Sequence, residues 1–242
     1  MESSSYDNND TIKSRSLEFS IIGLSTDPFE KLREGLELCP FTGVQSLRKR
    51  LNDRRDALQK DTTRHQFLVF SNVPVSIASN LSDDSCRVSK FARLFYNVTT
   101  QTLIVKITPS PEHEAASLAF YDCIRDEISA MDLEHEVEPL GSTTVQIGDW
   151  KKEADECWAV STQNTQITTI LEIGLSESSR RLALEARGWL ETRGSLVQVA
   201  ITLKIDRDIP KITIKCWELC ARQSSISTEH HLHRLLVLKK SV

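Results

Sequence analysis

The chain has 242 residues, 30 basic and 34 acidic side chains, a formal net charge of -4 and 39% hydrophobic residues. A chain of this length and composition can bury a full core, which predicts a globular protein with one main domain. The low net charge excludes binding to nucleic acid through bulk positive charge, although a local basic stripe stays open. No apolar run approaches the roughly 20 residues that span a bilayer, and the polar start MESSSYDNND lacks the apolar segment of a secretion signal. We therefore expect no membrane contact and an intracellular location, cytoplasmic or nuclear.

The six cysteines are spread along the chain without a CxxC pair. Most of them lie in apolar stretches, which predicts buried free thiols in a reducing compartment. Cys216, Cys220, His230 and His233 have a spacing that loosely resembles a zinc finger. A core thiol beside an exposed histidine cluster explains the same pattern better, because zinc sites usually show tighter cysteine pairing.

Residues 1–65 form a predicted N-terminal extension. Up to about residue 40 it is polar with short apolar clusters, so we expect it to be mostly flexible. A basic helix is predicted over 44–60, where apolar residues recur at helical spacing among the basic residues Arg48, Lys49, Arg50, Arg54 and Arg55. A charged face exposed to solvent is the simplest interpretation, and a nuclear import signal or a phosphate-contacting helix are the alternatives.

The predicted domain covers residues 66–220, where the hydrophobic pattern changes. A strand–helix–strand unit over 167–205 predicts two parallel neighbouring strands in a mixed sheet. The class is therefore α/β (α+β), with a mixed central β-sheet flanked by helices, followed by a tail at 221–242 that holds a candidate final strand. The expected elements are strands at 67–73, 142–147, 154–160, 166–174, 196–205 and 210–219, a hairpin at 94–108, and helices at 112–128 and 176–194.

Two carboxylates lie where β-structure should bury them. Asp155 begins the strand 154–160, and Glu172 lies inside the apolar run ILEIG. A buried carboxylate is costly unless it is paired, protonated or bound to a metal. If the two strands are neighbours, both side chains could hold one Mg²⁺, which takes one or two carboxylates together with water and phosphate oxygens, and Glu114 could add a third acid. The alternative is that Glu172 faces solvent at a sheet edge.

Several stretches, in their order and spacing, resemble a known family. They are ITPSPEHEAA, GSTTVQI, KKEADECW, ILEIGLSESSRRLALEARGWLE and VQVAITLKI. From about Leu94 to Trp217 the chain resembles the PD-(D/E)XK nuclease-like superfamily, in particular a group common in fungi and related to many bacterial proteins regarded as endonucleases. The resemblance implies a restriction-endonuclease-like core and Mg²⁺-dependent hydrolysis of phosphodiesters in nucleic acid, with Mn²⁺ as a substitute ion.

The resemblance also implies roles for individual residues. Asp155 takes the place of the first metal-binding aspartate, with Ala154 where a proline often stands. Glu172 takes the place of the (D/E) of the motif, and Glu114 matches a helix carboxylate that sometimes completes the metal site. The lysine of the motif, which orients water or stabilises charge on the phosphate, is replaced by Gly174.

Other basic residues are expected to compensate for that loss. Lys152, or Lys151 beside it, would supply the catalytic lysine from a neighbouring strand, and Lys151 is also expected to bind phosphate. Arg180 and Arg181, at the start of the following helix, would bind phosphate with help from the helix N-terminal amides. The missing lysine keeps two alternatives open: an inactive relative that serves as a nucleic-acid-binding or protein-interaction module, and a purely structural protein. No small-molecule cofactor is expected, and no oligomeric state is predicted.

Four further residues have structural explanations beside functional ones. His113 fits helix capping and packing as well as a role beside Glu114. Trp189 and Trp217 fall on apolar faces, which favours the core over a base-stacking surface. Ser176 has no histidine partner that would make it a nucleophile, and an N-cap role explains it.

Overall fold

The computed structural model describes residues 27–63, 65–81, 91–108, 110–161, 166–175 and 177–219. One mixed sheet has six strands in the order β1-β2-β4-β3-β7-β6, with β1 parallel to β2 and the other neighbours antiparallel. These strands are β1 (Leu38–Pro40), β2 (Phe67–Ser71), β3 (Ala92–Asn97), β4 (Thr102–Ile107), β6 (Thr144–Ile147) and β7 (Trp150–Glu153).

A second mixed sheet has five strands in the order β11-β10-β9-β8-β5. They are β5 (Val137–Pro139), β8 (Glu156–Val160), β9 (Gln166–Leu175), β10 (Val199–Asp206) and β11 (Lys211–Glu218). Strands β9 and β10 run parallel, as the strand–helix–strand pattern predicts, and β8 is the antiparallel neighbour of β9. The predicted α/β class with mixed β-structure flanked by helices is confirmed, and the strands are divided between two sheets.

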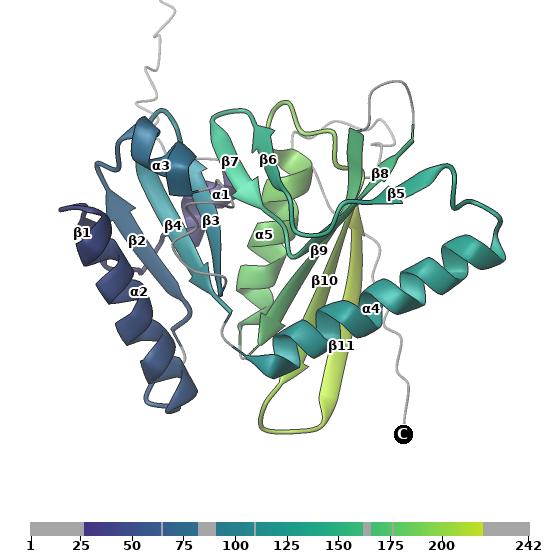
Figure 1. Cartoon of the computed structure of the whole chain (residues 1–242), viewed down its shortest axis with the longest axis horizontal. Helices are drawn as coiled ribbons and strands as arrows, with labels where there is room; N and C mark the ends of the chain where they lie inside the picture. Colours follow the sequence, from purple (N-terminus) through teal and green to yellow (C-terminus); the bar gives the residue numbers. More distant parts are fainter. Residues whose placement is uncertain are drawn as a thin grey trace, which may run out of the picture.

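The helices form layers with the two sheets (Figure 1). They are α1 (Pro28–Leu32), α2 (Val44–Gln59), α3 (Val75–Leu81), α4 (Pro111–Ala130) and α5 (Ser179–Glu191). Buried residues of α2 and α3 pack on the outer face of the six-stranded sheet, and α4 packs across the outer face of the five-stranded sheet. Helix α5 lies between the two sheets, so its side chains can reach both.

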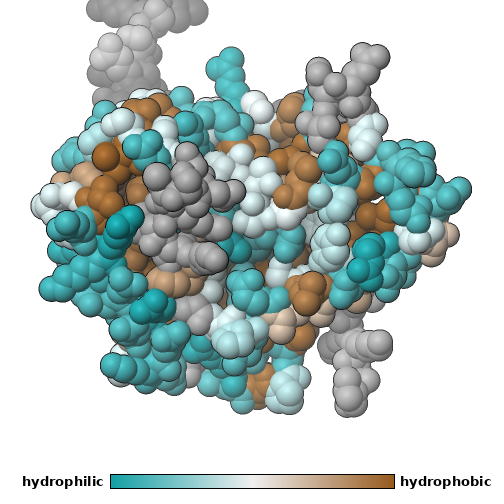
Figure 2. Space-filling view, viewed as in Figure 1, coloured by the Kyte–Doolittle hydropathy of each residue, from teal (hydrophilic) through white to brown (hydrophobic). Residues whose placement is uncertain are grey.

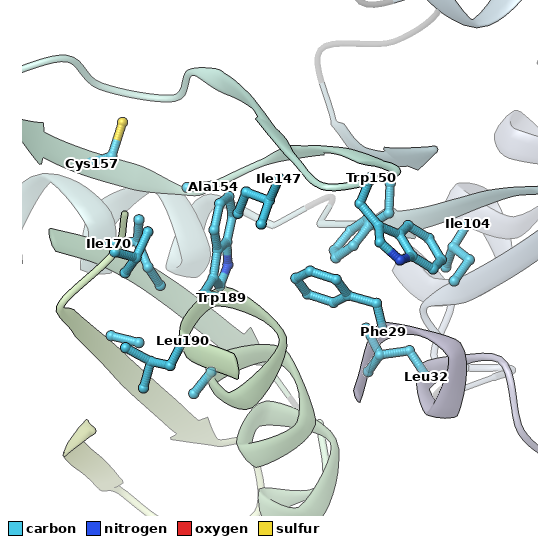
Figure 3. Close-up of a cluster of buried hydrophobic side chains, with 14 of the residues drawn as sticks. Phe29, Leu32, Ile104, Ile147, Trp150, Ala154, Cys157, Ile170, Trp189 and Leu190 are labelled. Atoms are coloured by element: carbon cyan, nitrogen blue, oxygen red, sulfur yellow. The ribbon is translucent and has the colours of Figure 1, made fainter. Parts of the chain in front are cut away.

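A central hydrophobic core fills the space between the sheets (Figure 3). Phe29 of α1 lies between Trp150 of β7 and Trp189 of α5, with ring centroids 5.5 and 6.3 Å away, respectively. All three side chains are at most 1% exposed. Aromatic rings at these separations add to the stabilisation from area burial, so this core joins the two sheets and α1 into one packed unit.

Local sequence explains where the two helices beside the candidate site begin. Ser110 caps α4 by accepting a hydrogen bond from the His113 amide, and Pro111 occupies the first turn. Ser178 caps α5 in the same way through the Arg181 amide. Ser176, for which an N-cap role was expected, lies outside the described residues. The predicted apolar face of α4 packs on the five-stranded sheet through Ala116, Phe120, Tyr121, Ile124 and Ile128.

The predicted basic helix is α2. Leu47, Leu51 and Leu58 are buried, while Arg48 and Lys49 are exposed, as expected for a charged face in solvent. The elements before residue 66 are packed against later ones, because β1 pairs with β2 and α1 contributes to the central core. The domain boundary at residue 66 stays a prediction, and the tail at 221–242 lies outside the described residues.

The surface and the cysteines of the described ranges agree with a packed protein. None of their helices is both long enough and apolar enough to cross a bilayer. Figure 2 shows one face that is largely hydrophilic, with hydrophobic side chains in separate groups. Cys39 and Cys157 are buried, Cys216 is half-buried and Cys123 is exposed, and all four are free thiols. Cys220 and both histidines of the zinc-like pattern lie outside the described residues.

Candidate functional site

Asp155 lies in the short connection between β7 and β8 and is 1% exposed. Its Oδ2 accepts a hydrogen bond from the backbone amide of Ile173 at 2.8 Å, which ties it to β9 beside Glu172. Its Oδ1 accepts a hydrogen bond from Arg93 Nε of β3 at 3.1 Å, and His113 Nε2 of α4 lies 3.3 Å from Oδ2. Burial raises the pKa of Asp155, but His113, Lys106 and Arg93 lower it further, so this pKa lies far below its usual value.

Glu172 lies on β9, is 1% exposed, and projects toward α5 and the six-stranded sheet. Its Oε1 accepts hydrogen bonds from Lys152 Nζ and, at 2.6 Å, from Trp189 Nε1. Its Oε2 lies 3.5 Å from Lys106 Nζ of β4. Burial raises the pKa of Glu172, yet Lys152, Lys106 and a hydrogen bond with Glu185 hold it below its usual value. The sheet-edge alternative is therefore wrong, because Glu172 is buried and paired.

The lysine that is missing at Gly174 has no room there. A Cβ on Gly174 would lie 2.7 Å from Leu182 Cδ1 and 3.0 Å from Glu177 Cβ, because α5 packs directly on this part of β9. Lys152 instead reaches Glu172 from β7, a strand that is not among the elements expected from the sequence. Its ammonium is 0% exposed and lies 4.1 Å from the Phe95 ring centroid and 4.5 Å from that of Trp189. Cation–π contacts of this kind attract an ammonium group to the ring faces in a dry site.

Three more ionisable residues belong to the site and were missed from the sequence. Lys106 of β4 is 0% exposed, and its Nζ lies 3.4 Å from Glu177 Oε2 and 3.3 Å from Glu185 Oε2. Lys152 Nζ also lies 3.5 Å from Glu185 Oε2. Two signals were available: Lys106 interrupts the apolar run of β4, and Glu185 lies on the same face of α5 as Leu182 and Trp189. Hereafter, the buried ion cluster means Lys106, Lys152, Glu172, Glu177 and Glu185.

The ionisable groups of the buried ion cluster shift one another's pKa values. Burial and the neighbouring Glu172 raise the pKa of Glu185 well above its usual value, which favours its protonated form. Burial lowers the pKa of Lys106, but Glu177, Glu185 and Glu172 raise it well above its usual value, so Lys106 is charged.

The remaining predicted residues lie apart from these contacts. The Glu114 side chain is 64% exposed, and the contact it makes is with His113 Nδ1 at 3.5 Å. Arg180 is exposed, and the Arg181 guanidinium stacks 4.5 Å from the Phe67 ring centroid. Lys151 is half-buried, at the β7 position next to Lys152. The structure thus brings Asp155, Glu172 and Lys152 together, and it does not join Glu114, Arg180, Arg181 or Lys151 to the same cluster.

The site does not fit a divalent metal ion in this arrangement. Both oxygens of Asp155 and both of Glu172 already have a nitrogen within 3.5 Å, and both residues are 1% exposed. Mg²⁺ requires octahedral oxygen ligands at about 2.0–2.1 Å and usually keeps several waters. Within the described ranges, no group of three or more histidine, cysteine, aspartate and glutamate side chains is placed to hold a metal ion. The expected shared Mg²⁺ is therefore not supported by this geometry.

The structure defines the chain as a mixed α/β protein with a buried acid–lysine cluster between two sheets. No protein-family model matches the chain, and no curated protein matches it. Among solved structures, the chain is similar to a protein from Anabaena variabilis described as a "putative nuclease belonging to DUF820", with 16% sequence identity. The alignment covers 50% of this chain and 70% of that chain, with a TM-score of 0.35. A likeness of this extent leaves the function to be argued from this chain's own geometry.

Proposed function

We propose that the protein is a nuclease-like domain of the PD-(D/E)XK type. One observation carries this proposal: Asp155, Glu172 and Lys152 meet between the sheets, although they come from different strands and connections. The Ile173 amide holds Asp155 beside Glu172, and Lys152 supplies the ammonium that Gly174 cannot supply. Two neighbouring acids, with a lysine in contact with one of them, are the residue types that the family resemblance implies for this place.

Within that class, we propose a member that binds nucleic acid without cleaving it, because the geometry of the two acids argues against cleavage. Each carboxylate oxygen of Asp155 and Glu172 is occupied by a buried donor or cation, so neither is free to bind a metal or to activate water. A phosphodiester would also have to reach side chains that are 1% exposed. We therefore derive no hydrolytic step for these residues.

Metal-dependent phosphodiester hydrolysis is the second candidate function. It is favoured by the position of Lys152, which contacts Glu172 as a water-orienting lysine of this class would. For hydrolysis, Asp155 and Glu172 would have to exchange their present partners for Mg²⁺ or Mn²⁺.

The two candidates are separated by binding and nicking assays on the full chain. We expect fluorescence anisotropy to detect binding to single-stranded or double-stranded DNA or RNA oligonucleotides, and we expect no plasmid nicking with Mg²⁺ or Mn²⁺. Nicking by the wild type that is lost in Glu172→Gln and kept in Glu34→Gln, whose side chain is exposed, would establish the hydrolase instead. If the protein neither binds nor nicks nucleic acid, the nucleic-acid proposal is wrong.

A further inference from the structure

Three carboxylates surround one ammonium group in the buried ion cluster. Lys106 Nζ lies 3.5 Å from Glu172 Oε2, 3.4 Å from Glu177 Oε2 and 3.3 Å from Glu185 Oε2. The lysine and the three acids are each at most 5% exposed. Lys106 comes from β4 of one sheet, while the acids come from β9, the segment before α5, and α5 itself. The lysine therefore enters the acidic group from the opposite side.

The acids in this group have more oxygens than donors. Among the described residues, neither oxygen of Glu177 has a hydrogen-bond donor of good geometry, and Glu185 Oε1 also lacks one. Buried carboxylate oxygens without donors are rare, because each costs desolvation free energy. These oxygens lack donors and surround a single cation, as carboxylate oxygens do around a bound metal ion.

We propose that Lys106 is the internal cation of this carboxylate cage, and that it takes the place of a bound divalent ion. The cage of Glu172, Glu177 and Glu185 then needs no metal while the lysine is present. Removal of the ammonium together with its side-chain volume converts the cage into a site for a divalent, oxygen-preferring cation such as Mg²⁺ or Mn²⁺. This inference concerns the chain's own charges, and it does not depend on whether the domain binds nucleic acid.

The test compares metal binding to the wild type and to Lys106→Ala in the full chain. We expect Lys106→Ala to have a lower melting temperature than the wild type without metal, because Glu177 then loses its contact with Lys106, and the Lys152 ammonium contacts only Glu172 and Glu185. Mn²⁺ far above its Kd should raise the melting temperature of Lys106→Ala by about 5 °C. Mn²⁺ titration followed by electron paramagnetic resonance should show about one ion bound to each chain of this variant.

The control variants distinguish the effect of removing the Lys106 charge from the effect of removing its side-chain volume. Mn²⁺ should not raise the melting temperature of the wild type or of Lys106→Met, which keeps the side-chain volume without the charge. Lys49→Ala, on the exposed face of α2, should behave like the wild type. Binding of Mn²⁺ in the cluster of the wild type, or no binding by a folded Lys106→Ala variant, would overturn the proposal. If Lys106→Ala does not fold with or without metal, Lys106→Ala/Glu177→Gln replaces it, since two carboxylates remain as ligands. Failure of that folded variant to take up Mn²⁺ would equally overturn the proposal.

Discussion

Glu185 lies beside Glu172 in a site that excludes water, and this neighbourhood determines its protonation. The pKa of Glu185 is raised by burial and by Glu172, whereas the pKa of Glu172 and that of Asp155 are lowered by nearby cations. The three acids therefore contribute to stability in different pH ranges. Glu172 and Asp155 add stability above their unfolded pKa values, near 4, and this stability is lost as the pH falls below that range.

Glu185 has the opposite effect, because its folded pKa lies above its unfolded pKa of about 4.3. As the pH rises above about 4.3, the unfolded chain loses this proton while the folded chain keeps it, so the free energy of unfolding falls. Glutamine cannot ionise, so Glu185→Gln should gain stability relative to the wild type between pH 5 and pH 8, by on the order of 1 kcal/mol. Urea unfolding of both proteins at the two pH values measures this difference.

The exposed Glu138→Gln variant is the control for that experiment, and its difference from the wild type should not change with pH. If the stability difference between Glu185→Gln and the wild type is the same at pH 5 and pH 8, then the pKa of Glu185 is not raised in the folded protein.

At the scale of elements, α1 packs on α5 through an unusually close contact. A Cβ built on Gly188 of α5 would lie 2.0 Å from Phe29 Cε1, a separation that side-chain atoms do not reach. Glycine costs up to about 1 kcal/mol in a helix interior relative to alanine. Gly188 therefore lowers the helix propensity of α5, but because it has no side chain it leaves room for Phe29 against the helix. The ring then reaches both Trp150 and Trp189.

Gly188→Ala should therefore destabilise the protein, although alanine is the better helix former. We expect a loss of about 1–3 kcal/mol, the usual cost of inserting a methyl group into a packed core. The same substitution should be neutral or stabilising in a Phe29→Ala background, where the methyl group has room. Urea unfolding of both single variants and the double variant measures this coupling, and additive effects would contradict the contact.

Local pattern predicted the elements around the site better than it predicted the site itself. Helices α4 and α5 and strands β8, β9 and β10 carry clear periodicity and capping residues, and each lies close to its predicted range. Strand β7 was missed because the sequence WKKE has no hydrophobic alternation, and its pairing with β3 comes from residues more than fifty positions away. Lys106 was overlooked for a similar reason, because its acidic partners lie on α5 and β9.

At the scale of the whole molecule, the buried ion cluster connects the two sheets. Lys106 and Lys152 belong to the six-stranded sheet, while Glu172 belongs to the five-stranded sheet and Glu185 to the helix between them. Arg93 of β3 likewise reaches Asp155 at the start of β8. Since the central core also spans this space, we expect the described sheets to unfold in one cooperative transition.

Lys152→Met tests this connection. Removal of the ammonium leaves Glu172 buried without its nearest cation, which should cost about 3–5 kcal/mol. The loss should appear as one transition in urea, and hydrogen exchange should accelerate equally in β4 and β9. Lys211→Met, at an exposed position of β11, should stay within about 0.5 kcal/mol of the wild type. Faster exchange confined to one sheet would mean that the sheets are stabilised separately.

The balance of the buried ion cluster also has a consequence for how this sequence can change over evolutionary time. Because Lys106 contacts Glu172, Glu177 and Glu185 at once, its replacement by a neutral residue leaves an excess of acidic groups inside the protein. Paired replacements that remove a positive and a negative group together leave no such excess. In related chains, these positions should therefore co-vary, with lysine and glutamate appearing or disappearing together.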